Sequence, residues 1–203
     1  MFSQSLKAYD IKAKVTGAHT LKVEPTALRS FDGIAVGGGN TFRLLYWLRK
    51  NDWMLQIQDM VSNGIPYFGS SAGSNVGTRN IKASNDMTIV DPGSLDALGL
   101  VPFIFNAHYL PGEGQQNQES RDTRLTELQE ENPDLCIFGP MEGGWGWMEN
   151  GVFSHRGNKP ALVAVPGEEW QMVEPGTDIS WLLTKQDELA EAYAKERLAK
   201  MVA

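Results

Sequence analysis

The stretch Ile65-Pro66-Tyr67-Phe68-Gly69-Ser70-Ser71-Ala72-Gly73 decides the fold class that we expect for this chain. Its apolar start predicts a short strand, and the small residues that follow predict a sharp turn into a helix. Ser71 has a glycine two residues before it and another two residues after it, which is the spacing of a nucleophile elbow. Glycine suits both places because the pinched turn leaves no room for Cβ atoms. Ser71, rather than Ser70, is therefore the candidate nucleophile, although this motif alone also fits a glycine-rich turn with two incidental serines.

The same order of elements precedes this stretch. Residues 33–36 predict a strand, Gly37-Gly38-Gly39-Asn40 a glycine turn, and the apolar spacing from Phe42 to Leu48 a helix. Strands that alternate with helices indicate an α/β fold, with a mostly parallel sheet covered by helices on both faces in three layers. Further strands are expected at Met87 to Val90, Phe103 to Asn106 and Leu135 to Phe138, and further helices at Trp53 to Val61, Glu119 to Glu131 and Trp181 to Met201.

Two segments of the chain, one near each end, differ from this alternation of strands and helices. Residues 146–173 alternate in polarity and contain the turn signal Glu149-Asn150-Gly151, so antiparallel hairpins are expected near the C-terminal edge of the sheet. At the start, Phe2 to Ala13 is amphipathic. A length of 203 residues fits one α/β domain that spans residues 1–203.

Composition and charge restrict the function classes. No apolar run approaches the ~20 residues needed to cross a bilayer, and Met1 to Leu21 has no signal-peptide core, so neither membrane nor export is expected. Cys136 is the only cysteine and lies in an apolar segment, which fits a reducing cytoplasm. The net charge is −7 with scattered Lys and Arg, which argues against a nucleic-acid partner.

A serine nucleophile needs a base, and the chain has three histidines. His108 follows the apolar segment Phe103 to Asn106, at the carboxyl edge of the predicted sheet, where open α/β sheets build their sites. His19 has no neighbouring signal and is expected on a loop. His155 lies in the hairpin region and is expected on a solvent-exposed turn. His108 is therefore the preferred base.

Two acidic residues compete to orient that base. Glu142 follows the apolar segment ending at Phe138, and Asp86 lies in Ser84-Asn85-Asp86-Met87. Spacing does not choose between them. The N–H of Ala72 at the elbow and a backbone N–H from the turn ending at Gly39 are candidate donors to an oxyanion. That glycine turn has neither the dinucleotide spacing nor a phosphate-loop lysine, and no metal-ligand cluster occurs, so neither a cofactor nor a metal is expected.

Six ordered motifs between about Lys14 and about Ala164 together resemble the peptidase E (aspartyl dipeptidase) family. They are Val36 to Phe42, Gly69 to Asn75, Asn85-Asp86-Met87, Asn106-Ala107-His108, Glu119-Ser120-Arg121 and Pro140 to Gly143. The resemblance implies a fold like that of the class I glutamine amidotransferases and cofactor-free hydrolysis of dipeptides that begin with aspartate. It makes Ser71 the nucleophile, His108 the base, Glu142 the third triad member, and Gly39 and Ala72 the oxyanion donors. It also matches Asp86 to an acidic residue that the family needs.

Specificity for aspartate requires a local cation, because a chain of net charge −7 does not attract a carboxylate by its overall field. The planar guanidinium of Arg121 is the candidate, and Asp86 would then face the substrate ammonium. The alternative is that Arg121 pairs with Asp122 or Glu119 on a solvated helix start.

The sequence departs from the family in two places. Ser70 stands where the family commonly has a large aromatic residue. The family's usual first strand and helix precede the point where this sequence starts, and an unpaired sheet edge would favour a homo-oligomer. Two other functions stay open: an inactive or binding protein on the same scaffold, and a carboxylesterase that would use His155 as its base.

Overall fold

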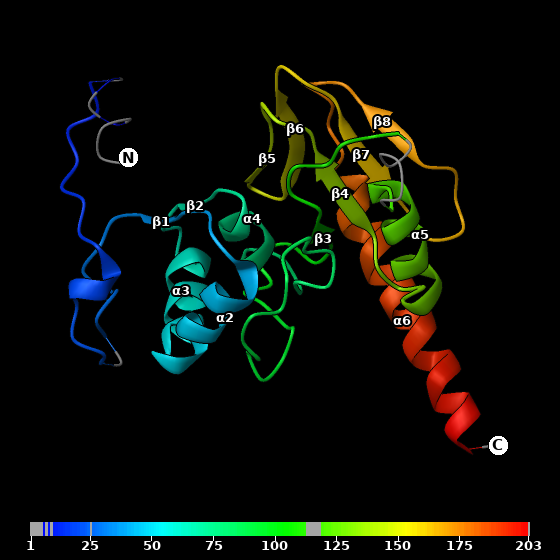
Figure 1. Cartoon of the computed structure of the whole chain (residues 1–203), viewed down its shortest axis with the longest axis horizontal. Coiled ribbons are helices and arrows are strands. Elements are labelled where there is room, and N and C mark those ends of the chain that lie inside the picture. Colours follow the sequence, from blue (N-terminus) through cyan, green and yellow to red (C-terminus); the bar gives the residue numbers. More distant parts are fainter. Residues whose placement is uncertain (1–5, 7, 9, 25, 113–118, 203) are drawn as a thin grey trace.

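A computed structural model describes residues 6, 8, 10–24, 26–112 and 119–202, and Figure 1 shows the arrangement of its elements. Half of the amphipathic stretch from Phe2 to Ala13 lies outside the described residues. In chain order the elements are η1 (Ala18–Thr20), β1 (Ile34–Val36), α2 (Thr41–Lys50), α3 (Trp53–Ser62), β2 (Tyr67–Gly69), α4 (Ala72–Val76), β3 (Ile104–Phe105), α5 (Arg121–Glu131), β4 (Ile137–Pro140), β5 (Gly144–Glu149), β6 (Val152–Gly157), β7 (Ala161–Ala164), β8 (Gln171–Val173) and α6 (Trp181–Val202).

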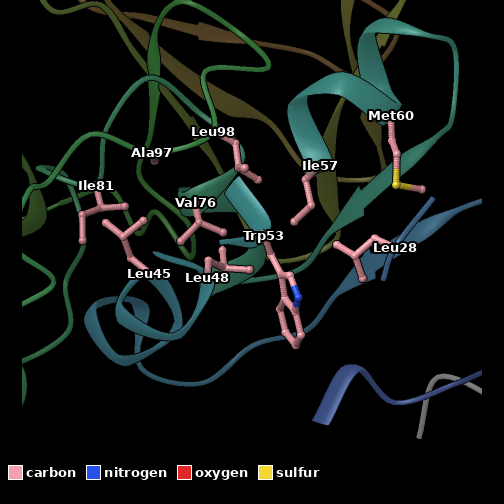
Figure 2. Packing of buried hydrophobic residues seen from close by; sticks show 10 residues of the cluster. All are labelled: Leu28, Leu45, Leu48, Trp53, Ile57, Met60, Val76, Ile81, Ala97 and Leu98. Carbon is pink, nitrogen blue, oxygen red and sulfur yellow. The ribbon is translucent and has the colours of Figure 1, made fainter. Parts of the chain in front are cut away.

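The first half of the fold carries the predicted elbow. Strands β1 and β2 pair in parallel, so Val36 lies opposite Gly69 and both strands end at the same edge. The apolar faces of α2 and α3 pack with α4 in one core cluster, which Figure 2 shows from close by. This packing fixes both glycine turns at one edge of the small sheet. The buried members of the cluster are Leu28, Leu45, Leu48, Trp53, Ile57, Met60, Val76, Ile81, Ala97 and Leu98.

The second half contains a four-stranded sheet in the order β3-β4-β7-β8, in which only β3 and β4 are parallel. Its two central strands are buried on both faces, so they read as continuous apolar runs rather than as alternating ones. Cys136, Phe138 and Val163 face a cluster that includes Leu182 of α6, whereas Ile137 and Leu162 face a cluster with Leu125 of α5. Helices thus cover both faces of this sheet, as Figure 1 shows.

Strands β5 and β6 form a separate antiparallel hairpin, as the alternating polarity predicts. Asn150 and Gly151 have φ values of 50° and 79° at its tip. Positive φ at both central residues is the turn geometry that matches the twist of paired strands, which is why an Asn-Gly pair occurs there. The hairpin leads directly out of β4 and returns to β7, next to the edge where β3 and β4 end.

The mixed α/β class is confirmed, and three details differ from the expectation. The described strands are not mostly parallel, because only β1–β2 and β3–β4 pair in parallel, whereas β4–β7, β5–β6 and β7–β8 are antiparallel. Residues 87–90 form no strand; Met87 is 79% exposed, and its carbonyl accepts a hydrogen bond from Asn40 Nδ2 at 2.8 Å. Within the described residues the strands form three sheets, and no ladder joins β2 to β3. The segment between them satisfies its backbone through loop bonds such as Leu98 N to Val76 O at 2.9 Å.

None of the described helices has the length and apolar character that a membrane-spanning helix requires. The longest, α6, begins against the sheet and ends in exposed polar turns that run away from it (Figure 1). Gln186 on its packed half is buried, and it accepts from Cys136 N at 2.8 Å and donates to Asp134 O at 2.5 Å. Burial raises the pKa of the Cys136 thiol to about 12, consistent with an unreactive core residue.

Candidate active site

Ser71 occupies the strained turn that its flanking glycines predict. Its φ is 56°, a region that residues other than glycine rarely adopt, and α4 begins at the next residue. A Cβ atom on Gly73 would lie 2.0 Å from the carbonyl oxygen of Val36, and one on Gly69 would lie 2.6 Å from that of Gly73. Both glycines are therefore required by close backbone approach, and the glycine-rich turn is a true elbow.

His108 lies three residues beyond the end of β3, with a φ of 60°. Tyr109 next to it is buried and its N–H donates to Pro140 O at 3.2 Å, which anchors the chain to the neighbouring strand. The imidazole ring of His108 extends from this anchored backbone. Nε2 of the ring lies 2.8 Å from Ser71 Oγ, within hydrogen-bond distance.

Glu142 lies in the tight turn from Met141 to Gly144 that joins β4 to β5, closed by a bond from Gly144 N to Met141 O at 2.9 Å. Gly143 has a φ of 91°, and its carbonyl accepts from Asn158 N at 3.0 Å, which ties the turn to the end of the β5–β6 hairpin. The turn directs Glu142 Oε1 onto Nδ1 of His108. Ser71, His108 and Glu142 therefore form one continuous chain of contacts.

This chain of side chains is open to solvent. The His108 side chain is 48% exposed and that of Glu142 is 81% exposed, so their contact contributes little to stability. The contact between Glu142 and His108 instead orients the imidazole ring. A carboxylate on Nδ1 leaves Nε2 free to accept a proton from Ser71. A depression of about 380 Å³ lies elsewhere, beside α5 between Ala83 and Leu128, and none of the three residues lines it.

The turn from Gly37 to Gly39 runs beside the nucleophile. A Cβ atom on Gly38 would lie 3.1 Å from Ser71 Cβ and 3.4 Å from its Oγ, so only glycine leaves the space above the hydroxyl free. Gly39 has a φ of 138° and leads into α2. On the other side of Ser71, Ala72 is the first residue of α4. Ser71 thus lies between Ala72, which follows it in the chain, and Gly38, the residue before the predicted donor Gly39.

Asp86 does not reach His108. Its Oδ2 accepts hydrogen bonds from Thr41 N at 2.7 Å and Thr41 Oγ1 at 2.6 Å, at the start of α2. Of the two acids between which the sequence does not choose, only Glu142 contacts the imidazole. Sequence reasoning missed Thr41 as the partner of Asp86, although its place directly after the glycine turn is a signal that could have found it.

Arg121 is the first residue of α5, and one of its terminal nitrogens, Nη1, is buried without a hydrogen-bond partner in the described part of the chain. Burial lowers the pKa of its guanidinium, Arg124 lowers it further, and the negative charge of Asp86 opposes both. The two carboxylates expected as alternative partners bind elsewhere. Asp122 accepts from Tyr109 Oη at 2.7 Å, and Glu119 pairs with Arg124 at 3.1 Å.

The expectation for His155 is wrong. Its side chain is fully buried on the inner face of β6, where its ring lies 5.7 Å from that of Phe138. Nε2 lies 2.7 Å from Lys159 O and Nδ1 lies 3.3 Å from Trp145 O. Strand pairing, rather than the turn signal, decides this burial, because alternate residues of a strand face the core. His19 is exposed on η1, as expected.

His155→Ala is expected to lower the free energy of unfolding by about 2–4 kcal/mol, since it removes a packed ring and leaves a buried carbonyl oxygen without its donor. Urea unfolding followed by circular dichroism measures the change. His19→Ala serves as the matched control, because His19 is exposed, and should change stability by less than about 0.5 kcal/mol. Equal stabilities of the two variants would contradict the buried position of His155.

Comparison with known proteins decides the family. The sequence profile described as peptidase family S51 matches residues 2–155, which contain Ser71, His108 and Glu142. The chain belongs to peptidase family S51. It is therefore a peptidase, and α6 lies outside the part that matches the S51 profile.

Individual relatives agree with this family. The chain is similar to "Peptidase E" of Shewanella sp. (strain ANA-3), with 39% identity over 179 residues that cover 86% of this chain and 74% of the relative. It is also similar to "Peptidase E" of Nostoc sp. (strain PCC 7120), with 37% identity over 177 residues that cover 87% and 73%. A solved structure of a putative peptidase E from Listeria monocytogenes EGD-e is 26% identical, with a TM-score of 0.45, over 73% of this chain and 62% of that one.

Proposed function

We propose that this S51 peptidase is a serine dipeptidase that hydrolyses dipeptides with an N-terminal aspartate. The observation that carries the proposal is the continuous contact chain from Glu142 through His108 to Ser71, with the serine held in a strained elbow. The three residues come from different turns at one edge of the fold, as a preorganised hydrolytic site requires. The peptidase E relatives support a serine dipeptidase.

The chemistry follows from this geometry. Ser71 Oγ attacks the carbonyl carbon of the scissile peptide bond while its proton passes to His108 Nε2. Glu142 holds the Nδ1 proton and stabilises the imidazolium that forms. His108 then gives its proton to the leaving amine, the C–N bond breaks, and an acyl ester on Ser71 remains. Water activated by His108 hydrolyses that ester and restores the free serine.

The oxyanion that forms in both steps needs backbone donors at about 2.7–3.1 Å. The N–H groups of Gly39 and Ala72 are the candidates, because the two residues lie on the turns at either side of Ser71. The start of α4 adds partial positive charge on the same side. Loss of one such donor typically reduces turnover by about 10²–10³-fold.

Specificity for aspartate rests on Arg121 in this proposal. A buried guanidinium nitrogen without a partner is costly unless a ligand satisfies it, and a carboxylate is the ligand whose geometry fits a guanidinium. The competing pairings with Asp122 and Glu119 are absent among the described residues, which favours a substrate role. The ammonium role of Asp86 and the homo-oligomer stay predictions.

The carboxylesterase alternative is disfavoured by the same geometry. It requires His155 as the base, and the ring of His155 contacts Lys159 O and Trp145 O in the core rather than Ser71. One assay separates the three functions: incubation with Asp-Leu, Asn-Leu and a p-nitrophenyl ester. The proposal expects rapid hydrolysis of Asp-Leu alone. Ester hydrolysis without peptide hydrolysis would favour an esterase, and no hydrolysis would favour an inactive or binding protein.

Arg121→Met is expected to reduce kcat/KM for Asp-Leu by at least ~100-fold, since removal of a buried charge partner costs roughly 3 kcal/mol or more. Arg124→Met is the matched control, because Arg124 lies one turn further along α5 and its partner is the exposed Glu119. It should keep most of the activity. The reaction of Ser71 with a small fluorophosphonate should be unchanged in both variants. If Arg121→Met slows both reactions equally, Arg121 supports the fold rather than aspartate binding.

A further inference from the structure

The hydrogen bonds of Asp86 connect it to the glycine turn at residues 37–40, which contains the candidate oxyanion donor Gly39, and not to Ser71, His108 or Glu142. Its carboxylate accepts two short hydrogen bonds from Thr41, one from the backbone N–H at 2.7 Å and one from the hydroxyl at 2.6 Å. Thr41 is fully buried and is the first residue of α2. It directly follows the turn from Gly37 to Asn40, in which Gly38 lies against Ser71. Asp86 therefore holds the end of this turn through Thr41.

Thr41 also connects this turn to the nucleophile helix. Its hydroxyl oxygen accepts a hydrogen bond from Asn75 Nδ2 at 3.2 Å, and Asn75 is a buried residue of α4, four positions after Ser71. The hydroxyl thus donates to Asp86 and accepts from Asn75. One side chain thereby links the carboxylate, the helix after the glycine turn and the helix after the elbow.

The loop that carries Asp86, residues 83–87, reaches the base as well. Asn106 Nδ2 donates to Ala83 O at 2.8 Å, and Asn106 is fully buried two residues before His108. On the other side of the loop, Asn40 Nδ2 donates to Met87 O at 2.8 Å. The loop therefore spans the distance between the strand end that bears His108 and the glycine turn beside Ser71.

We propose that Asp86 is a positioning residue, which acts through Thr41 to hold the Gly37–Gly39 turn, and with it the Gly39 N–H, in place over Ser71. A carboxylate at a helix N-terminus is favoured by the helix dipole, and its hydrogen bonds are stronger than those of a neutral acceptor. This role is an alternative to the expected contact between Asp86 and the substrate ammonium. It rests on the proposed function, because it assumes that Gly39 serves an oxyanion at Ser71.

A fluorophosphonate distinguishes the two roles of Asp86. A small reagent of this class has no ammonium group, yet its phosphoryl oxygen needs the same oxyanion donors when Ser71 attacks phosphorus and fluoride leaves. If Asp86 positions the turn, Asp86→Asn and Thr41→Val should each slow phosphonylation by about 10-fold or more and lower kcat for Asp-Leu with little change in KM. If Asp86 binds the ammonium, Asp86→Asn should leave phosphonylation unchanged and raise KM, which would overturn the proposal.

Two further variants separate positioning from general damage. Thr41→Ser keeps the hydroxyl and should restore phosphonylation to within about 3-fold of the native rate. Ser84→Ala removes a hydroxyl that donates to the same Asp86 oxygen at 3.4 Å and accepts from Asp86 N at 3.3 Å. Both contacts are longer than those from Thr41, so this variant should slow phosphonylation by less than about 3-fold. The double variant of Asp86→Asn and Thr41→Val should be no slower than the worse single variant, because both break one linkage. Additive losses would contradict the linkage.

The test remains decisive if one variant fails to fold. Thermal unfolding identifies such a variant, and Thr41→Val, which keeps the carboxylate and the Thr41 N–H, then carries the comparison alone. Native protein that reacts with neither Asp-Leu nor the fluorophosphonate would contradict the proposed function itself. Native protein that reacts with both, together with a Thr41→Val variant that reacts at the native rate, would contradict only the positioning role.

Discussion

Ser71→Ala is expected to abolish the hydrolysis of Asp-Leu, because the variant has no nucleophile at the elbow. Loss of a triad nucleophile leaves a residual rate that is lower by roughly 10⁶-fold, which a dipeptidase assay with leucine detection reads as zero. The small side chain of alanine fits the same turn, although its Cβ keeps the strain of a positive φ. Thermal unfolding should therefore show little change between the native chain and this variant.

Ser70→Ala is the matched control for the nucleophile. The described hydrogen bonds of Ser70 are made by its backbone. Its N–H donates to Val36 O at 3.0 Å, and its carbonyl accepts from Gly73 N at 2.9 Å. Alanine keeps both of these bonds, so most of the activity should remain. An active Ser71→Ala variant beside an inactive Ser70→Ala variant would show that the assignment is wrong.

His108→Ala should lower kcat for Asp-Leu by about 10³-fold or more, since the serine then has no group that accepts its proton. KM should change far less, because the imidazole contacts Ser71 and Glu142 in this structure. The variant should also remain folded, because the His108 side chain is 48% exposed and contributes little to the core. Alanine at this position keeps most of the strain of the positive φ, so it neither adds nor removes much stability. Steady-state kinetics on the folded variant separates these two effects.

Glu142→Gln tests how much the carboxylate that contacts His108 contributes to kcat. Glutamine keeps the shape but not the charge of the side chain on Nδ1, so kcat should fall, though by less than in His108→Ala. Combining both changes should cost no more than His108→Ala alone, because Glu142 acts through the imidazole. A Glu142→Gln variant with native kcat would show that the acid has no role in turnover.

The sequence by itself determined the features whose cause is local. Gly69 is required by a local cause, because a Cβ atom there would collide with the backbone of Gly73 in the same turn. The clash at Gly73 is with Val36 on the neighbouring strand, so the sequence shows the glycine spacing of the elbow but not this contact. The Asn150-Gly151 pair predicts the hairpin tip through its positive φ values. The apolar run before Gly139 predicts a strand buried on both faces, and the structure places it in the centre of the four-stranded sheet.

Only the tertiary structure decided which distant residues meet. Glu142 and Asp86 are both acids next to apolar segments, but a tight turn brings Glu142 to His108, whereas Asp86 binds Thr41, which lies 45 residues away in the chain. The alternating polarity predicts the hairpin that contains His155, but the burial of its side chain depends on which face of that hairpin the rest of the fold covers. The physical reason is that a turn is set by the sterics of a few neighbouring residues, while a side chain's partner is set by packing between elements far apart in sequence.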